Sequence, residues 1–361
     1  MVTIKADKMA ALVSDMFAKA GTSRAEADRI GNALVVANLT GHDSHGVQRV
    51  PRYLQWLKEG VVLADQTAKI VTESPVYAVV DGLHGFGQTV APQAVEIGLA
   101  KCRAMGLSMV ALRNAGHIGR VGEYAETAAA AGLVSVHFVN AAGSVLVAPF
   151  GGAERRFSTA PYCVGVPRPG APPLILDFAT SIVAEGKVLN ASFGGKPLPN
   201  DALVAPDGTI SNDPHVLYGD YTVSGPRNYQ QGIGAIRAFG DHKGSGLAFM
   251  CELLGGSLTG TGATEEGRRF ANGMLSFYVD PTRIDPEGFF PVDVASYTAH
   301  VKSTRPITPG GEVLVPGEPE QRMRAERGKN GLPLPEATWA AIVASAKAGG
   351  LDDTRVQAAM T

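Results

Sequence analysis

The stretch "LSMVALRNAGHIGRVGEYAETAAAAGLVSVHFV", residues 107–139, contains the pattern that decides the fold class. It begins with an apolar run, passes through closely spaced glycines, continues as an alanine-rich segment at 120–132 and ends in a second apolar run. The short apolar runs predict strands, and the alanine-rich segment predicts a helix. A strand, a helix and a strand in succession indicate an α/β unit.

The same alternation continues on both sides of this stretch. Residues 76–82 predict a strand and residues 90–106 a helix, and "LILDF" at 174–178 predicts a buried strand. Residues 243–260 predict a buried helix, and residues 273–280 predict another strand. We therefore expect an α/β domain over residues 76–280.

The segments that flank this domain have a different character. Residues 3–60 are predicted to be helical, with Ser23 and Glu26 at capping-box spacing, a stop at Gly41 and Pro51 in the first turn of a further helix. Residues 281–335 are rich in proline, glycine and charge, so we expect an extended or looped segment before a final helix at 335–350. The predicted organisation is a helical N-terminal region (1–75), the α/β domain (76–280) and a C-terminal part (281–361) whose helix packs back on the core.

The composition is that of a globular chain with little net charge. Of the 361 residues, 45% are hydrophobic and 18% are charged, with a formal net charge of -2, so neither nucleic acid nor a membrane surface is an expected partner. No apolar run is long enough to span a membrane, and Asp7 and Asp15 interrupt the apolar N-terminal run that a secretory signal requires. Three separated cysteines, Cys102, Cys163 and Cys251, fit reduced packing residues in a cytoplasmic protein.

Two common families of sites are not supported by motifs. No G-x-G-x-x-G follows a predicted strand and no G-x-x-x-x-G-K-[ST] occurs, so a standard Rossmann or P-loop nucleotide site is not predicted. The G-x-S-x-G motif of many serine hydrolases is also absent.

The stretch "DSHGVQRVPRY", Asp43 to Tyr53, places three polar side chains four residues apart: His45, Arg49 and Tyr53. If this segment is helical, the three side chains share one face. A guanidinium suited to a carboxylate, an imidazole that exchanges protons near neutral pH and a phenol together predict a site for a small acid. The alternative is structural, with Arg49 paired to a nearby acid and His45 capping the preceding helix.

Three further features remain candidates for ligand binding. His42 and His45 have a spacing possible for metal ligands, but no third ligand completes a site, so no metal is predicted. In "LRNAGHIGRVGEYAE", backbone N–H groups and a helix N-terminus could face an anion beside His117, although a plain glycine-rich connection explains the same residues. In "GDHKGSGLA", His242 and Lys243 precede a predicted helix, where a bound phosphate or carboxylate would offset the charge of a lysine that is otherwise simply solvated.

The chain resembles the malate/L-lactate dehydrogenase family, which also contains sulfolactate, ureidoglycolate and diketogulonate dehydrogenases and cyclic-imine carboxylate reductases. The resemblance covers roughly residues 10–320 and is carried, in order, by "DSHGVQRVPRY", "NAGHIGRVGEY", "VAPFGG", "LDFATSIVAEGK", "GDHKGSGLAFMCELLGG" and "VLVPGEPE". It implies a sulfolactate dehydrogenase-like fold that is not of the Rossmann type, with a mixed-sheet cofactor domain. It also implies a homodimer and hydride transfer between NAD or NADP and a small carboxylate substrate.

The resemblance also implies roles for individual residues. His45 would be the acid or base with Ser44 beside it, Arg49 would hold the substrate carboxylate with Tyr53 nearby, and His117 would lie close to nicotinamide and substrate and serves in some members as the proton acceptor. Cofactor contacts would come from His117 and from a further set of residues: Asn140, Asp177, Phe178, Ala179, His242, Lys243, Pro316, Gly317 and Glu318.

This chain departs from the family pattern in two places. It reads Thr159, Ala160 and Pro161 where many members read Thr-Asn-Pro, and so it lacks an amide that could bind cofactor or substrate. The region from Tyr218 to Arg237 and the tail after Glu320 match no pattern of the family, so the substrate is expected to differ from those of the named members.

Three functions follow as hypotheses. The first is an oxidoreductase of 2-hydroxy or 2-oxo acids. The second is a reductase of cyclic imine carboxylates, which needs the same carboxylate-binding group and proton donor. The third is a binder of small carboxylates without catalysis.

Overall fold

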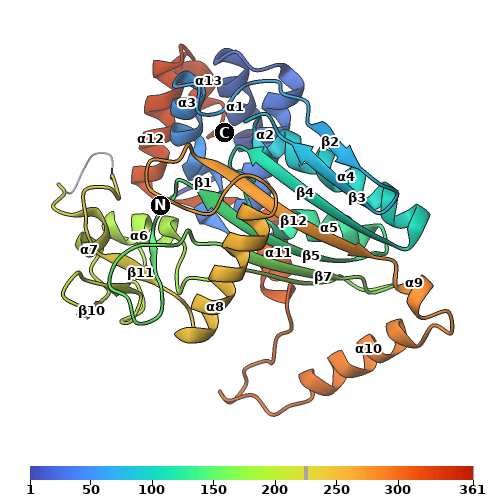
Figure 1. Cartoon of the computed structure of the whole chain (residues 1–361). Helices are drawn as coiled ribbons and strands as arrows, with labels where there is room; N and C mark the ends of the chain where they lie inside the picture. Colours follow the sequence, from blue (N-terminus) through green and yellow to red (C-terminus); the bar gives the residue numbers. More distant parts are fainter. Residues whose placement is uncertain (223–226, 361) are drawn as a thin grey trace.

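The computed structural model describes residues 1–222 and 227–360 and contains three sheets (Figure 1). The largest has seven strands in the order β2-β3-β4-β12-β5-β7-β8. β3 and β4 run parallel, and the other neighbouring pairs run antiparallel, so the sheet is mixed. Its strands are β2 (Lys69–Glu73), β3 (Tyr77–Asp81), β4 (Leu107–Ala115), β5 (Val134–Ala142), β7 (Pro161–Val166), β8 (Leu174–Ala179) and β12 (Ala271–Val279).

Helices cover both faces of this sheet. α4 (Gly87–Met105) and α5 (Gly122–Ala130) pack on one face, where small side chains allow close approach. A Cβ at Gly98 of α4 would run into the ring of Tyr278 on β12, so glycine is required there. On the other face, α8 (His242–Cys251) and the π-helical stretch Glu252–Ser257 contact β5. The elements predicted over residues 76–139 are confirmed.

The two ends of the chain form a second core (Figure 1). Here β1 (Val2–Ile4) pairs with β13 (Leu332–Leu334), although β1 lies in a region predicted to be helical throughout. The helices of this core are α1 (Ala6–Lys19), α2 (Arg24–Leu39), α3 (Val50–Lys58), α12 (Glu336–Ala348) and α13 (Asp353–Gln357). The predicted cap of α2 is confirmed, because the Ser23 hydroxyl accepts a hydrogen bond from the Glu26 amide at 3.3 Å.

A smaller unit, which the sequence did not predict, surrounds a four-stranded sheet of order β10-β9-β11-β6. Its elements are β6 (Val147–Ala148), β9 (Leu203–Val204), β10 (Ile210–Ser211), β11 (Ala235–Arg237), α6 (Glu185–Ser192) and α7 (His215–Tyr218). These strands have only two or three residues each, too few for a visible alternation of apolar and polar side chains. Part of the segment from Tyr218 to Arg237, residues 223–226, lies outside the described residues.

The prediction that residues 281–335 are extended or looped holds for residues 303–317, which form neither helix nor strand, and is wrong for most other residues of this segment. They contain α9 (Pro281–Ile284), α10 (Phe289–Lys302) and α11 (Glu318–Asn330), and α9 and α10 project from the body of the molecule (Figure 1). Pro281, Pro291 and Pro319 each lie in the first turn of a helix, where a missing N–H costs nothing. Three of the prolines that indicated a loop therefore stand at helix starts, whereas Pro306, Pro309 and Pro316 do lie in a loop.

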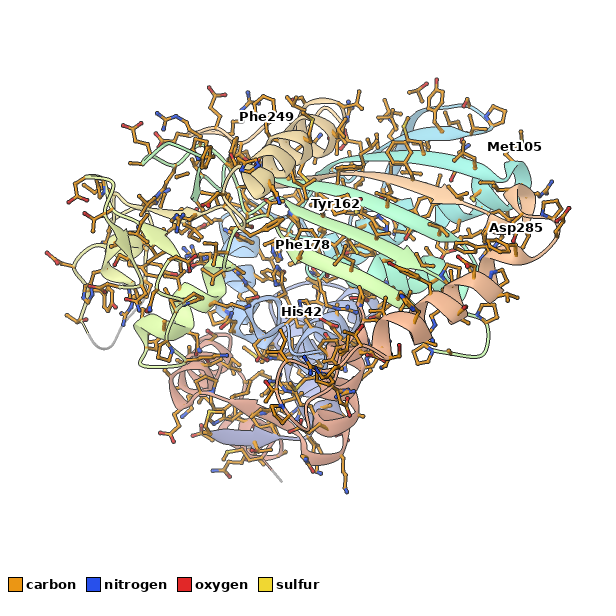
Figure 2. All side chains as sticks on the ribbon, turned by 90° about the horizontal axis from the view of Figure 1, so that it is seen from below. His42, Met105, Tyr162, Phe178, Phe249 and Asp285 are labelled. Atoms are coloured by element: carbon orange, nitrogen blue, oxygen red, sulfur yellow. The ribbon has the colours of Figure 1, made fainter. Side chains whose placement is uncertain are left out.

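Two predictions of burial are also wrong. β8 is an edge strand of the large sheet, where Leu176 is 39% exposed, and Figure 2 shows Tyr162 and Phe178 side by side on β7 and β8. α8 has one exposed side, which carries Phe249 and Met250 at 49% and 48% exposure (Figure 2). An uninterrupted apolar run does not by itself distinguish a fully buried element from one with an exposed apolar side.

Candidate active site

The segment with His45, Arg49 and Tyr53 is not one helix, which corrects the prediction of a single column of side chains. Two short 3₁₀ turns, Asp43–His45 and Val47–Arg49, are separated by an extended residue at Gly46, and only then does α3 begin. A side chain at Gly46 would collide with the amide of Asn38 in α2. The Asn38 amide fixes this turn, because its oxygen accepts the Val47 N–H at 2.8 Å and its nitrogen donates to Asp43 at 2.6 Å.

The fold instead brings His45 against His117, which follows β4. Their rings stack at 5.4 Å between centroids with an interplanar angle of 20°. Nδ1 of His45 lies 2.9 Å from the Ser44 hydroxyl, and Nδ1 of His117 lies 2.5 Å from the Tyr53 hydroxyl. Among residues 1–222 and 227–360, neither ring has a hydrogen-bond partner at Nε2. The two Nε2 atoms are thus the groups left for a substrate.

Gln88 of α4 completes the support of His117. Its side-chain nitrogen donates to the Tyr53 hydroxyl at 3.3 Å and to the His117 carbonyl at 3.1 Å. Burial raises the pKa of Tyr53 to about 12, so the phenol keeps its proton. When the Tyr53 hydroxyl donates to Nδ1 of His117, the Nε2 of that ring carries the N–H.

Both histidines are held in the neutral form. Burial among protein atoms, followed by the charge of Arg49, lowers the pKa of His117 to about 3. Burial, then His117 and Arg49, lowers the pKa of His45 well below 6.5. Both residues are only half-buried, so small molecules can reach them.

Arg49 lies beside the histidine pair and is engaged on two sides. Its Nε donates to the Ser44 carbonyl at 2.6 Å, and its Nη2 lies 3.4 Å from Oε2 of Glu185, the first residue of α6. Oε1 of Glu185 accepts a hydrogen bond of 2.7 Å from the Tyr218 hydroxyl. The alternative that Arg49 pairs with an acid is therefore realised, although Nη1 has no partner among the residues the structure describes.

Two of the segments predicted to bind the cofactor lie side by side along β8. The Ile175 N–H donates to the Pro316 carbonyl at 3.3 Å, which brings Pro316, Gly317 and Glu318 next to the strand that carries Asp177, Phe178 and Ala179. Gly317 has φ +92°, and a Cβ there would lie 3.1 Å from the Ile175 nitrogen, so this turn needs glycine. Asp177 accepts the N–H of Gly122, at the start of α5, at 2.7 Å.

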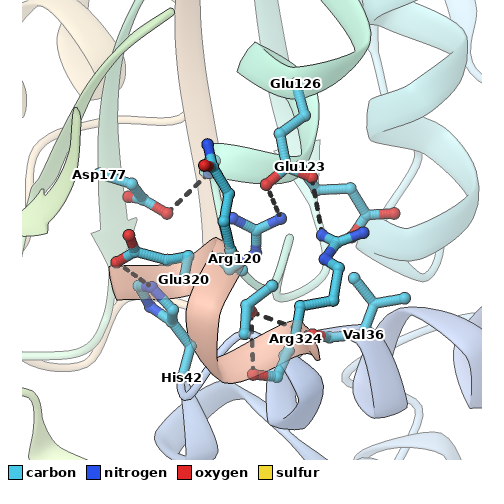
Figure 3. A network of polar contacts seen from close by, with 12 residues as sticks. Val36, His42, Arg120, Glu123, Glu126, Asp177, Glu320 and Arg324 are labelled. Atoms are coloured by element: carbon cyan, nitrogen blue, oxygen red, sulfur yellow. Dashed lines mark hydrogen bonds and ion pairs between the residues drawn. The ribbon is translucent and has the colours of Figure 1, made fainter. Parts of the chain in front are cut away.

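A charge network lies between these segments and the His45 turn (Figure 3). Arg120 is 3% exposed and pairs with Glu126 at 2.8 Å, while Glu126 also pairs with Arg324 at 3.0 Å. His42 contacts Glu320 of α11 at 3.4 Å, so the turn with His45 is tied to the helix that follows Gly317. Burial and the neighbouring Glu320 act to raise the pKa of Asp177, and His42 and Arg120 oppose this rise without cancelling it.

A pocket of about 600 Å³ opens next to this network. Its walls come from α5, the connection between β7 and β8, and the start of α11, with Glu126, Ile175, Gly317 and Glu320 among the lining residues. The predicted cofactor residue Gly317 thus faces a space of ligand size.

Asn140, His242 and Lys243 lie elsewhere. Asn140 is fully buried, its nitrogen donates to Glu252 and the Gly262 carbonyl, and its oxygen accepts the Gly273 N–H, so a cofactor contact by its side chain would require one of these bonds to be exchanged. His242 and Lys243 are exposed at the first turn of α8. Phe239, which precedes α8, connects this region to β8, because its ring centroid lies 5.3 Å from that of Phe178.

Comparison with known proteins shows where this arrangement belongs. The sequence pattern of one family, described as malate/L-lactate dehydrogenase, matches residues 4–343. The chain belongs to the malate/L-lactate dehydrogenase family. Hydroxycarboxylate dehydrogenase B of Escherichia coli (strain K12) is 36% identical over 357 residues, which cover 98% of this chain and 96% of that protein.

Solved structures agree with this membership. A structure described as a putative malate/lactate dehydrogenase from E. coli superposes with a TM-score of 0.91 at 34% identity and covers 99% of this chain and 98% of its own. Delta1-piperideine-2-carboxylate reductase from Pseudomonas syringae pvar. tomato superposes with a TM-score of 0.78 at 26% identity, over 96% of this chain and all of its own. The predicted family and the predicted α/β fold with a mixed sheet, unlike a Rossmann fold, are confirmed. The chain is thus an oxidoreductase of the hydroxy-acid dehydrogenase family.

Sequence reasoning missed several residues of this candidate site. Gln88 and Tyr218 lie outside the quoted motifs, and Arg120 and Glu185 lie inside them but were given no role. A charged residue inside an otherwise apolar or glycine-rich motif, such as Arg120, is a signal that could have been followed.

The described residues were also searched for two other features. In residues 1–222 and 227–360, no three His, Cys, Asp or Glu side chains gather as metal ligands. No helix in the same ranges is both long and apolar enough to cross a membrane. All three cysteines are buried and free, as predicted.

Proposed function

We propose that this protein transfers a hydride between NAD or NADP and a small 2-hydroxy or 2-oxo carboxylic acid, as a malate- or lactate-like dehydrogenase. The observation that carries the proposal is the placement of two neutral histidines, each with a free Nε2, beside the guanidinium of Arg49. An anion held by Arg49 would present its neighbouring carbon and oxygen to these rings.

The chain's own groups divide the work as follows. Nη1 of Arg49 binds the substrate carboxylate and fixes its angle of approach. In the direction of oxidation, neutral His45 accepts the proton of the 2-hydroxyl, and the N–H at Nε2 of His117 donates to the same oxygen. In the direction of reduction, His45 first takes up a proton, which the bound anion favours, and then donates it to the carbonyl oxygen.

The cofactor supplies the hydride donor or acceptor when it is bound, and the buried polar groups near Asp177 fit such a ligand. Nε and Nη1 of Arg120 are buried without a hydrogen-bond partner among the described residues, as expected for a group that binds an anionic ligand. A Cβ at Gly122 would lie 2.6 Å from Nη1 of Arg120 and 3.0 Å from Asp177, so glycine allows both side chains to approach the start of α5. Arg120 and the N-terminus of α5 would hold phosphate, and Asp177 would accept ribose hydroxyls. Phe178, Ala179, Pro316, Gly317, Glu318, His242 and Lys243 remain proposed contacts along the cofactor.

Reduction of a cyclic imine carboxylate is a second candidate. The similarity to delta1-piperideine-2-carboxylate reductase supports it, because such a substrate also carries a carboxylate beside the carbon that receives hydride. Its imine nitrogen would take the place of the ketone oxygen between His45 and His117. The same residues therefore serve both reactions, and only turnover separates them.

The test is a turnover screen that follows the absorbance of the reduced cofactor. NADH and NADPH are each offered 2-oxo acids and cyclic imine carboxylates, and lactate and malate are assayed in the reverse direction. We expect turnover with at least one acid and a higher melting temperature in the presence of the cofactor, since a ligand that binds the folded state stabilises it. No turnover with any compound and no shift with either cofactor would support the binder without catalysis.

We also propose a homodimer. α9 and α10 project from the body, and Phe289, Val292 and Tyr297 of α10 are 67%, 68% and 66% exposed (Figure 1). A helix with this much uncovered apolar surface is typical of an interface. Light scattering after gel filtration would give twice the monomer mass, whereas a monomer would contradict the proposal.

A cytoplasmic location is the remaining part of the proposal. Cys102, Cys163 and Cys251 are free thiols that form no disulfide with one another, which suits a reducing compartment. Cell fractionation with an antibody to the chain would test it.

A further inference from the structure

Glu185 stands next to the group that binds the substrate, and the proposed reaction does not use it. Its side chain is 15% exposed and lies 3.4 Å from Nη2 of Arg49, whose own side chain is 19% exposed. Glu185 begins α6, and a Cβ at the following Gly186 would lie 2.7 Å from Cβ of Ser44. α6 is therefore packed directly against the turn that carries Ser44 and His45.

The carboxylate of Glu185 is held in place from its other side by Tyr218. The Tyr218 hydroxyl donates to Oε1 at 2.7 Å, and burial, followed by the charge of Glu185, raises the pKa of this phenol so that it stays a donor. The guanidinium of Arg49 and the hydroxyl of Tyr218 therefore contact the two oxygens of this carboxylate from opposite partners. Glu185 is thus a fixed negative charge beside Arg49.

The position of Tyr218 depends on Arg155. This arginine donates four hydrogen bonds of 2.6 to 3.0 Å to the carbonyls of Leu217, Tyr229, Gly232 and Gly234. A guanidinium that uses four of its five N–H donors in this way anchors the backbone around it. The segment that carries Tyr218 is therefore built to hold one geometry around Glu185.

The charges at this end of the site limit which acids can bind. Arg49 and Glu185 cancel each other, and the two neighbouring histidines are neutral. A monocarboxylate adds one negative charge, which Arg49 binds. A second carboxylate or a sulfonate on the same small molecule would lie near Glu185 with no further cation supplied by this pair, and like charges repel at such distances. A hydroxyl or ammonium group on the substrate would instead donate to Glu185.

We propose that Glu185 selects the substrate: a 2-oxo or 2-hydroxy monocarboxylate that carries a hydroxyl or ammonium group near the reacting carbon, with dicarboxylates disfavoured. This inference rests on the proposed dehydrogenase function and narrows its substrate class. Tyr218 is a positioning residue, which acts by keeping Glu185 in place.

The test compares matched pairs of 2-oxo acids in the wild type and in Glu185→Gln. The ratio of kcat/KM for hydroxypyruvate to that for pyruvate measures the effect of a hydroxyl donor on the substrate. The ratio for oxaloacetate to 2-oxobutyrate measures the effect of a second carboxylate. We expect wild-type kcat/KM to favour hydroxypyruvate and 2-oxobutyrate, and Glu185→Gln to shift both ratios by about tenfold or more toward pyruvate and oxaloacetate, as for loss of one charged hydrogen bond. Glu154→Gln removes the same charge at an exposed position and is the matched control, with unchanged ratios.

Direct binding separates failure of this inference from failure of the dehydrogenase function. If no compound is turned over, calorimetry with glycerate and malate still reports selection, and we expect tighter binding of glycerate in the wild type and a reduced preference in Glu185→Gln. Tyr218→Phe should give a partial shift in the same direction. The inference is overturned if wild type prefers the dicarboxylate, or if Glu185→Gln leaves both the kinetic ratios and the binding preference unchanged.

Discussion

The two ends of the proposed active site differ in charge: one end is neutral and the other carries an ion pair. At the histidine end, burial keeps His45 and His117 neutral, and the hydroxyls of Ser44 and Tyr53 orient their rings. At the arginine end, Arg49 and Glu185 are both charged and oppose each other. The neutral end is suited to moving a proton, and the charged end to choosing an anion. We therefore propose that catalysis and substrate selection fall to separate groups within one small site.

The largest expected effect comes from removing the cation, Arg49, from the charged end. Arg49→Ala should lower kcat/KM by about 10³-fold or more and raise KM, because it removes the carboxylate contact and leaves Glu185 as an unopposed charge. Steady-state kinetics with the best substrate measure this. Arg49→Lys should recover only part of the loss, since lysine cannot form the planar contact.

The double variant Arg49→Ala with Glu185→Gln sharpens the same point. It should be more active than Arg49→Ala alone, because the repulsion is gone. Equal activity of the two variants would show that Glu185 does not act on the bound substrate.

Removal of the proton acceptor from the neutral end should have the next largest effect. His45→Ala should lower kcat by about 10²- to 10³-fold, the usual worth of a general acid or base, while the affinity for the cofactor changes little. Titration of the cofactor by its fluorescence supplies the second measurement. If His45→Ala keeps its turnover and His117→Ala loses it, His117 is the proton acceptor.

The smallest expected effect concerns stability and pH. The pKa of His117 in the folded chain is lowered to about 3 from 6.5. As the pH falls below 6.5, His117 therefore becomes protonated in the unfolded chain but stays neutral in the folded chain. The free energy of unfolding consequently decreases down to about pH 3. Above 6.5 this group contributes no pH dependence.

The measurement is the urea midpoint near neutral pH and at about pH 5. His117→Gln should lose less stability over this interval than the wild type, and His215→Gln, at an exposed histidine, should behave as the wild type. An equal loss in His117→Gln and wild type would contradict a neutral His117 in the folded protein.

The residues of the neutral end and Arg49 could be singled out from the sequence, whereas the partners of Arg49 at the charged end could not. His45, Arg49, Tyr53 and His117 stand in short motifs, and the strand and helix around His117 follow from a local apolar pattern. Their convergence does not come from one helical face, because Gly46 breaks the segment and Asn38 sets its turn. Local spacing singled out residues that lie close together in the structure, but a shared helical face is not the reason that they meet.

The partners of Arg49 depend on contacts between distant segments. Glu185 begins a helix of the small unit, and Tyr218 is placed by Arg155 through four backbone carbonyls, none of which leaves a periodic signal. The same holds for α10, whose proline lies in its first turn and suggested a loop. Local sequence patterns therefore predict neither contacts between distant segments nor helices with a proline in the first turn.

The central claim is that hydride moves between a nicotinamide and the carbon beside a carboxylate held by Arg49. The most direct measurement uses reduced cofactor with both hydrogens of carbon 4 replaced by deuterium, with mass spectrometry of the product acid. The account predicts one deuterium on carbon 2 of the product, and none when Arg49→Ala is assayed for the same short time. Product that forms in the wild type without deuterium at carbon 2 would contradict it.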